Sequence, residues 1–234
     1  MSTLNVDKVD PSTGTALEIG SSGDTITVPS GATFAVSGTM NASSITAGTV
    51  ATARLGSGTA DGTTFLRGDQ TYAAPGGGIT EADMWRLHTA FTGDANPITT
   101  NFERNDTAGF SQLGTGMTES SGVFTFPSTG IWWIAAQWFN ALNNAECRYI
   151  FNDIVTTVDD GSNWVLSGRS ATSLGYFENS WTHISGYNSV IFDVTSTSTH
   201  KVRFEVTLSN TDTTTGAHTD RNDDGFTFIR LGDT

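Results

Sequence analysis

The stretch Gly122-Val123-Phe124-Thr125-Phe126-Pro127-Ser128-Thr129-Gly130-Ile131-Trp132-Trp133 decides the fold of this 234-residue chain. Phe124 and Phe126 alternate with small or polar residues, which is the period of a half-buried strand. Pro127 and Gly130 then mark a tight turn. A second strand follows, with bulky core candidates at Ile131, Trp133 and Trp138. The stretch therefore predicts a strand, a turn and a strand against a hydrophobic layer, and with them a β-rich domain.

Composition divides the chain near position 78. Residues 1–78 contain half of the 26 Gly, no Trp and few other aromatic residues. Within one chain, so little apolar surface does not offset a backbone ordering cost of about 1–2 kcal/mol per residue. We therefore expect this part to be disordered or to share a core with other chains, with a flexible Gly hinge at 76–78. Residues 79–234 hold all six Trp and can fold alone.

Charge excludes several classes of partner. The formal net charge is −13, with 6 acidic against 3 basic residues before position 79 and 18 against 8 after it. Nucleic-acid binding relies on Lys and Arg, so DNA and RNA partners are not expected. Lys8 and Lys201 are the only lysines, and no run of 18 apolar residues occurs, so we expect no membrane insertion. The first residues lack a secretory signal, which predicts synthesis in a cytoplasm.

Short apolar pieces separated by Gly turns fill the first part of the chain. Each piece alternates apolar residues with Thr or Ser, and single strands of this kind would leave unpaired edges. Three chains wound about one axis would pair them, so the pattern predicts an intertwined trimeric β-shaft. The pieces are residues 16–19, 25–28, 33–36, 44–45, 49–50 and 64–66.

Strand candidates recur through the second part, with turn residues between them. They predict an all-β domain, an antiparallel sandwich of jelly-roll size. Residues 79–88 fit either a capped helical turn or the beginning of a strand. The candidates are residues 85–91, 123–126, 131–139, 148–151, 154–158, 181–185, 190–194, 201–208 and 226–231.

Several phrases resemble known families. Leu66-Arg67-Gly68-Asp69-Gln70-Thr71-Tyr72 is similar to a phrase of tailed-phage fibre proteins, usually closer to Leu-Arg-Gly-Asp-Gly-Thr-Trp, from which Gln70 and Tyr72 depart. The start of the chain, from Leu4 to Gly14, also resembles phage structural proteins. The run from Phe124 to Trp132 and the final Gly225-x-Phe strand resemble C1q-like and tumour-necrosis-factor-like jelly rolls, in which Tyr is usual where Trp132 stands.

These resemblances imply a homotrimeric virion fibre. Residues 1–78 would attach to other virion proteins and form the shaft, and residues 79–234 would form a C1q-like knob that binds a host-surface receptor, with a glycan as the expected class and a protein as the other. A structural head-decoration or collar fibre without an obligatory receptor is the first alternative, and a polysaccharide depolymerase is the second. The expected function is binding, without enzymatic activity or cofactor.

Two sets of aromatic residues are candidates for contacts. Trp164 and Tyr176 lie in loop-like stretches and are the expected receptor contacts, because exposed aromatic rings stack on sugars. The resemblance to trimeric jelly rolls places Trp132, Phe226 and Phe228 at the trimer interface, with the chain's own core as the alternative for Trp132.

Signals for chemistry are weak. The four His residues show no metal-binding spacing, and Cys147 is the only cysteine. The carboxylate pairs Asp159-Asp160 and Asp223-Asp224 favour turns over a glycosidase pair. The acidic run 212–224 lacks the spacing of a calcium loop, and Arg67-Gly68-Asp69 favours a turn over an integrin ligand. We therefore expect no catalytic residue and no metal site.

Overall fold

The computed structural model describes residues 9, 13–14, 19, 21–33, 35, 50–74 and 78–234. The chain divides into two compact units, Met1–Ala73 and Ala74–Thr234, which we treat separately. Gly76 and Gly77 of the expected hinge lie outside the described residues, as do 34 in all of the 78 residues expected to form the attachment and shaft segment. Residues 21–33 are described and contain turns but no strand, although the sequence predicts one at 25–28.

The first unit contains a small hydrogen-bonded segment. A 3-10 helix, η2 (Thr52–Arg54), precedes an antiparallel hairpin of β1 (Phe65–Leu66) and β2 (Tyr72–Ala73). No residue between 50 and 74 is buried, and Phe65 exposes 63% of its surface. Within one chain this segment is therefore held by backbone hydrogen bonds and turns, without a hydrophobic core.

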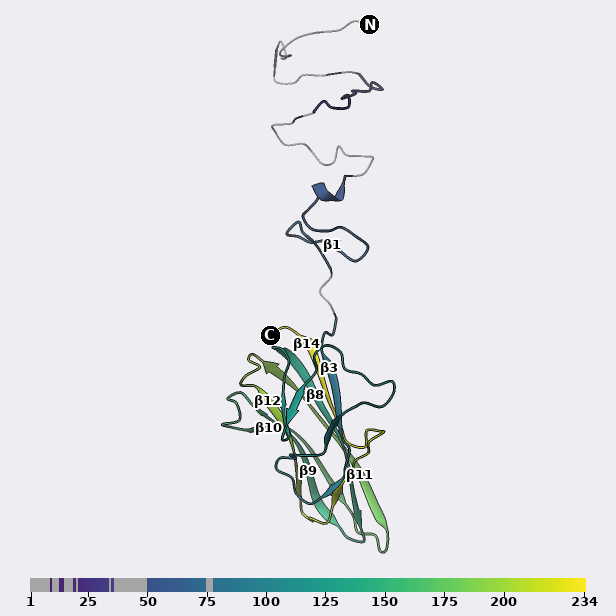
Figure 1. Ribbon diagram of the computed structural model, residues 1–234, viewed down its shortest axis with the longest axis vertical. Coiled ribbons are helices and arrows are strands. Elements are labelled where there is room, and N and C mark those ends of the chain that lie inside the picture. The colour runs from purple at the N-terminus through teal and green to yellow at the C-terminus, as the bar shows by residue number, and fades with distance from the viewer. Residues whose placement is uncertain are drawn as a thin grey trace. The chain divides into compact units, whose positions relative to one another are not determined.

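The second unit, whose residues 78–234 we call the head, consists of two antiparallel sheets (Figure 1). The first sheet contains β3 (Ala82–Leu87), β4 (Phe91–Thr92), β5 (Phe102–Arg104), β8 (Gly130–Asn143), β11 (Trp181–Val194), β13 (Thr214–Thr215) and β14 (Gly225–Gly232). The second sheet contains β6 (Thr118–Ser120), β7 (Val123–Thr125), β9 (Cys147–Thr157), β10 (Val165–Leu174) and β12 (Lys201–Leu208).

The strand order is that of a jelly roll. The main strands of the first sheet lie in the order β3-β14-β8-β11, and those of the second in the order β7-β12-β9-β10. If these eight main strands are numbered 1 to 8 along the chain, the first sheet has the order 1-8-3-6 and the second has the order 2-7-4-5. Most consecutive strands therefore lie in opposite sheets. Such double Greek-key winding closes two four-stranded layers over one core. The predicted all-β jelly-roll sandwich is therefore confirmed for the head.

The stretch from Gly122 to Trp133 forms its two strands, but they are not a hairpin. β7 belongs to the second sheet and β8 to the first, so the chain crosses from layer to layer between them. Phe126 and Trp132 lie on either side of this crossing, and their ring centroids are 5.2 Å apart. The preceding turn is the hairpin: Ser121 and Gly122 join β6 to β7 with φ of 52° and 83°, as in a type I′ turn.

Aromatic rings fill the space between the sheets. Phe204 of β12 is fully buried, and its ring lies 4.2 Å from that of Phe226 and 5.6 Å from that of Phe124. Phe228 and Trp138 of the first sheet also lie within 6.2 Å of it. The contacts with Phe124 and Trp138 are edge-to-face, and such contacts stabilise a core beyond simple burial. One side chain of the second sheet thus contacts rings of both β8 and β14 in the first.

Several strands differ from the sequence expectation. Residues 82–87 form β3, so the helical alternative for residues 79–88 is wrong. The segments predicted at 148–151 and 154–158 are one strand, β9, and those at 181–185 and 190–194 are one strand, β11. β10 was not predicted. Its sequence, VLSGRSATSL, has small residues where alternating large ones would mark a strand.

We expect Phe204→Ala to lower the free energy of unfolding of the head by about 3–5 kcal/mol, because it removes the ring that joins the two aromatic layers. Urea denaturation followed by Trp fluorescence measures this loss. Val165→Ala is the control, since Val165 is 62% exposed and its truncation should change stability by less than about 0.5 kcal/mol. Equal effects of the two substitutions would contradict this account of the core.

Candidate functional site

The two sheets differ in the charge of their outward faces. β8 and β11 have 14 residues each, and Asp193 is their only Asp, Glu, Lys or Arg. Apart from Asp193, the outward side chains of their central parts form a face that we call the uncharged face; it comprises Ile131, Trp133, Ala135, Gln137, Phe139 and Ala141 of β8 and His183, Tyr187 and Ile191 of β11. Ile191 exposes 69% and Tyr187 58% of their surfaces. By contrast, β12 directs Lys201, Arg203 and Glu205 outward.

The uncharged face has features of an interface. A hollow of 110 Å³ lies on it, with Ala135 and Gly225 among its lining residues and Trp133, Tyr187 and Met84 around them. β11 pairs with β8 alone and is therefore an edge strand of its sheet, with β10 close to its middle at Gly186 and Val190. A long edge strand with exposed apolar side chains promotes association unless something covers it. The signal in the sequence is a 14-residue strand without charge, which was not predicted to form an interface.

The residues predicted at a trimer interface are instead in the core. Trp132 exposes 1% of its surface, and Phe226 and Phe228 expose none. They face the second sheet because β8 and β14 alternate their side chains between core and exterior. The Trp132 indole donates a hydrogen bond to the Ser128 carbonyl at 3.2 Å. The ring that replaces the usual Tyr is therefore accommodated within one chain, where no second chain can contact it.

Exposed aromatic residues gather at one end of the head. Tyr176 exposes 56%, Phe177 63% and Trp181 55% of their surfaces; we call these three residues the tip. They lie where β10 leads into β11, next to the β8–β9 turn, since the Asn144 amide donates to the Ser180 carbonyl. The chain enters the head at the other end, where Gly130 and residues 230–232 meet, and Figure 1 shows the C-terminus there.

Trp164 lies at the opposite end of β10 from Tyr176. It ends the β9–β10 loop, and the Arg203 guanidinium lies 4.2 Å from its ring centroid. β10 has 10 residues, so the two predicted contact residues are separated by about 30 Å. The structure therefore does not bring them into one site. Tyr176 belongs to the tip, and Trp164 belongs to the outward face of the second sheet.

The two carboxylate pairs have different environments. Asp159 and Asp160 lie in the β9–β10 turn, where Asp160 has φ of 58° and Asp159 accepts a 2.6 Å hydrogen bond from the Thr157 hydroxyl. Asp223 pairs with Arg221 at 2.7 Å. Asp224 is fully buried, and its Oδ1 accepts the Phe139 amide at 2.9 Å, whereas its Oδ2 has no partner. Neither pair has the two facing carboxylates of a glycosidase.

Hydrogen bonding and burial shift the pKa values of two of these carboxyl groups in opposite directions. The Thr157 hydroxyl and Asn163 lower the pKa of Asp159 from 3.8 to about 2. Burial raises the pKa of Asp224 well above 3.8, and the neighbouring Asp223 adds to the rise. Ionisation of Asp224 therefore destabilises the folded head.

Metal chemistry finds no support in the described part of the chain, which contains no group of three or more His, Cys, Asp or Glu side chains placed to hold a metal ion. His183 stacks on Phe139 with centroids 5.4 Å apart. His200 is buried beside Thr195 and Thr199. The acidic run considered for calcium holds Asp224 in the interior and Asp223 on Arg221.

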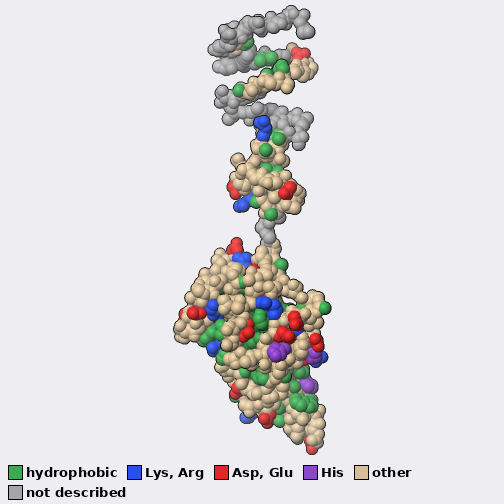
Figure 2. Space-filling model, viewed as in Figure 1, with side chains coloured by type: hydrophobic (Ala, Val, Ile, Leu, Met, Phe, Trp, Pro, Cys, Tyr) green, Lys and Arg blue, Asp and Glu red, His purple; other side chains and the backbone are tan. Residues whose placement is uncertain are grey.

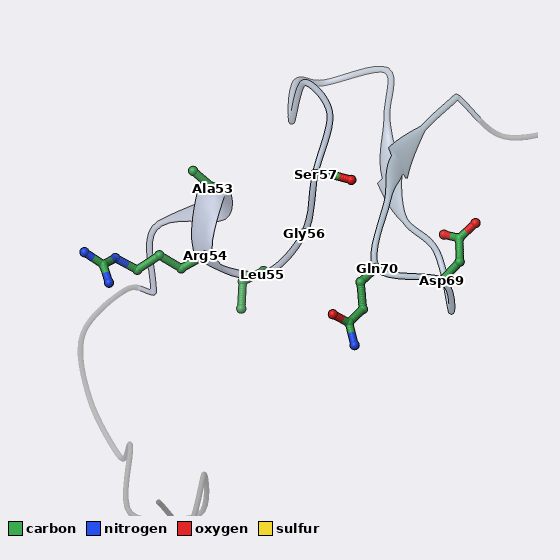
Figure 3. A pocket seen from close by; sticks show the side chains of 7 residues that line it. All are labelled: Ala53, Arg54, Leu55, Gly56, Ser57, Asp69 and Gln70. Carbon is green, nitrogen blue, oxygen red and sulfur yellow. The ribbon is translucent and has the colours of Figure 1, made fainter. Parts of the chain in front are cut away.

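The Arg67-Gly68-Asp69 sequence forms the turn between β1 and β2. Asp69 Oδ1 accepts hydrogen bonds from the amide and the hydroxyl of Thr71, and Gln70 has φ of 63°. Gly is usual at this position in the phage phrase, which agrees with the left-handed backbone. Figure 3 shows that Arg54 and Asp69, beside a hollow of this segment, point away from each other. These side chains do not converge on a ligand.

Comparison with known proteins gives structural likeness alone. No protein-family model and no curated protein matches this chain. Among solved structures, murine APRIL is similar with 10% identity and a TM-score of 0.46, over 64% of this chain and 98% of that one. Eiger TNF from S. frugiperda is similar with 14% identity and a TM-score of 0.49, over 67% of this chain and 95% of that one.

No helix among the described residues could span a membrane.

We expect Asp224→Asn to raise the stability of the head at neutral pH. Because the folded-state pKa of Asp224 is raised, the carboxyl group favours the fold fully below pH 3.8 and loses this contribution as pH rises through the folded value. Urea midpoints of wild type and variant should therefore converge at acidic pH and separate toward pH 7.

Asp159→Asn is the matched comparison, and we expect it to change stability at neutral pH in the opposite direction. Its lowered pKa means that ionised Asp159 favours the fold above pH 3.8 and ceases to do so as pH falls through about 2. This variant should be less stable than wild type at pH 7 and equal to it near pH 2. An Asp224→Asn variant that loses stability at pH 7 would contradict the assigned burial.

Proposed function

We propose that this chain is a homotrimeric virion fibre protein. In this proposal residues 1–78 attach to other virion proteins and form a shaft, and the head binds a receptor on the host surface through the tip. The receptor is expected to be a glycan in the first place. The observation that carries the binding function is the tip, because three large aromatic side chains exposed together at the end of a domain mark an interaction site.

The uncharged face supports self-association. It is the part of the head where apolar rings are exposed without charges between them, as in the buried centre of a subunit interface. β11 adds an edge strand whose outward side chains Tyr187 and Ile191 another copy would cover. Closed cyclic assembly covers such a face on every subunit, and the trimer is the symmetry that the resemblance to phage fibres and C1q-like heads implies.

Residues 50–74 support the same conclusion independently. The segment has a hairpin and regular backbone hydrogen bonds, yet Phe65 and Leu66 expose 63% and 45% of their surfaces. So small a unit needs an additional source of stability. Apolar contacts with the same segment of other copies would supply it, as in the shaft that the sequence predicts.

Three tips on one particle-bound trimer would act together. A weak site repeated on a rigid body binds a repetitive surface by avidity, which can exceed the single-site affinity by about 10²–10⁴-fold. A host surface that displays many copies of one glycan or protein satisfies this condition. Within the head, the tip lies at the end opposite to the start of β3, whose Ala82 pairs with Ile229 of β14.

We expect Ile191→Asp to weaken the trimer, because it would place three unpaired carboxylates in the covered face. Sedimentation of the full chain over a dilution series measures this effect. Wild type should sediment at three times the chain mass of 24.8 kDa, and the variant should dissociate at a concentration at least about tenfold higher.

Val165→Asp is the control for Ile191→Asp. Val165 is a β-branched residue with similar exposure, 62% against 69%, but it lies on the second sheet. The Val165→Asp trimer should dissociate at the same concentration as the wild-type trimer. If Ile191→Asp also does so, the uncharged face is not the interface.

We expect Tyr176→Ala combined with Phe177→Ala to reduce binding of labelled full chain to host cells by at least about tenfold, since two exposed rings are lost from the contact. Phe110→Ala is the control, because Phe110 is 45% exposed in another loop. Unchanged binding by the double variant would exclude the tip. A wild type that binds no cells, found by electron microscopy on the capsid or collar, would support the decoration alternative instead.

A further inference from the structure

The outward face of the second sheet carries a continuous row of aromatic and charged side chains, unlike the rest of the head. The row runs from β9 to β10 and β12, and we call it the stacked row. Its members are Tyr149, Phe151, Arg169, Asp153, Glu205 and Arg203.

Each member of the stacked row is held by its neighbours. The rings of Tyr149 and Phe151 are stacked with centroids 4.9 Å apart and an interplanar angle of 17°. The Arg169 guanidinium lies 4.2 Å from the Phe151 centroid and donates to both carboxylate oxygens of Asp153, at 2.8 and 2.6 Å. This fork fixes the guanidinium in one plane. The hydrogen bonds to Asp153 raise the pKa of Arg169.

The row continues across the sheet to β12. Glu205 is the cross-strand partner of Asp153, and it accepts a 2.8 Å hydrogen bond from Arg203. The Arg203 guanidinium in turn lies over Trp164. Tyr149 and Val155, the strand partner of Arg203, are six residues apart on β9, so the row is about 20 Å long. It can therefore contact a chain of several sugar units.

The charges of the stacked row cancel. Its two guanidinium groups pair with its two carboxylates. The head as a whole has an excess of acidic residues. Figure 2 shows one side of the head, on which acidic and basic side chains are interspersed. An anionic ligand would find both guanidinium groups of the row already paired, and the nearby Lys201 of β12 is held by Thr125 and the Thr197 carbonyl. The paired groups still offer hydrogen-bonding atoms to the solvent, because the Arg169 side chain is 39% and the Arg203 side chain 22% exposed.

We infer that the stacked row is a binding site for an uncharged oligosaccharide. Tyr149 is 41% exposed and stacks on the apolar face of a sugar ring, since its other face is already packed on Phe151. The partly exposed groups of Arg169, Arg203 and Glu205 exchange hydrogen bonds with sugar hydroxyls, whereas Asp153 is buried and holds Arg169 in place. The row is already ordered, so binding costs little side-chain entropy. This site requires neither the tip nor the trimer, and it is separate from the proposed receptor contact.

Affinity electrophoresis of the full chain in native gels tests the inference. The probes are the neutral polysaccharides dextran, mannan and galactan, with alginate as the anionic comparison. We expect at least one neutral polysaccharide to retard the protein and alginate to have no effect. Tyr149→Ala should raise the apparent Kd by at least about tenfold, whereas Tyr149→Phe, which keeps the ring, should remain within about threefold.

Two further sets of variants distinguish binding at the stacked row from binding at the tip and from a loss of folding. Arg169→Lys keeps the charge but loses the fork, and it should also weaken retardation, with an unchanged circular-dichroism spectrum as the check on folding. Phe110→Ala and the double substitution at Tyr176 and Phe177 should leave retardation unchanged, even where the latter abolishes cell binding. The inference is overturned if no neutral polysaccharide retards the wild type, if alginate alone does, or if Tyr149→Ala is retarded like the wild type.

Discussion

The packing of Phe204 against the aromatic residues around it is the contact on which the rest of the head depends. Its ring lies within 6.3 Å of five other aromatic rings, those of Phe102, Phe124, Trp138, Phe226 and Phe228. Residues so far apart in sequence meet because the jelly-roll path alternates between the layers. Once these rings are enclosed, strand alternation determines which side chains of every strand face outward. The two outward faces then acquire different chemistry: one is almost free of charge, and the other carries compensated ion pairs.

The sequence predicted the fold class, the alternating core positions Phe124 and Phe126, and strands at most of the correct places. It failed where the core is polar. Asn188 is buried, accepts the Trp138 indole hydrogen at 2.8 Å and donates to the carbonyl groups of Asn152 and Gly168. In the sequence, Gly186-Tyr187-Asn188 looks like a turn, so one long strand was divided in two. Gly186 instead allows β10 to approach, since a Cβ there would lie 2.4 Å from Ser170 Oγ.

The candidate site was predicted less well than the fold, for a geometric reason. The aromatic count identified the relevant residues but not their direction, and a shift of one residue moves a side chain from core to surface. Ile131 and Trp133, which the sequence places in the core, face outward, and Trp132 is enclosed instead. Likewise, Phe228 is enclosed and Ile229 faces outward. Tyr176 was correctly expected to be exposed. The stacked row could not be predicted, because its members come from three strands whose pairing register is a property of the folded chain.

The head has a buried core, whereas residues 50–74 have regular hydrogen bonds without one. This difference suggests an order of assembly for the proposed trimer. The head encloses its own aromatic core, so a single chain has a reason to fold there. Residues 50–74 have hydrogen-bonded turns but no buried residue, and in the proposed trimer they would gain most of their stability from other copies. If three heads associate through the uncharged face, they hold three such segments at a high effective concentration. The head would then fold first, and its association would lower the entropic cost of forming the shaft. A head that supplies both the binding surface and the nucleus of assembly is consistent with the concentration of aromatic residues in the second part of the sequence.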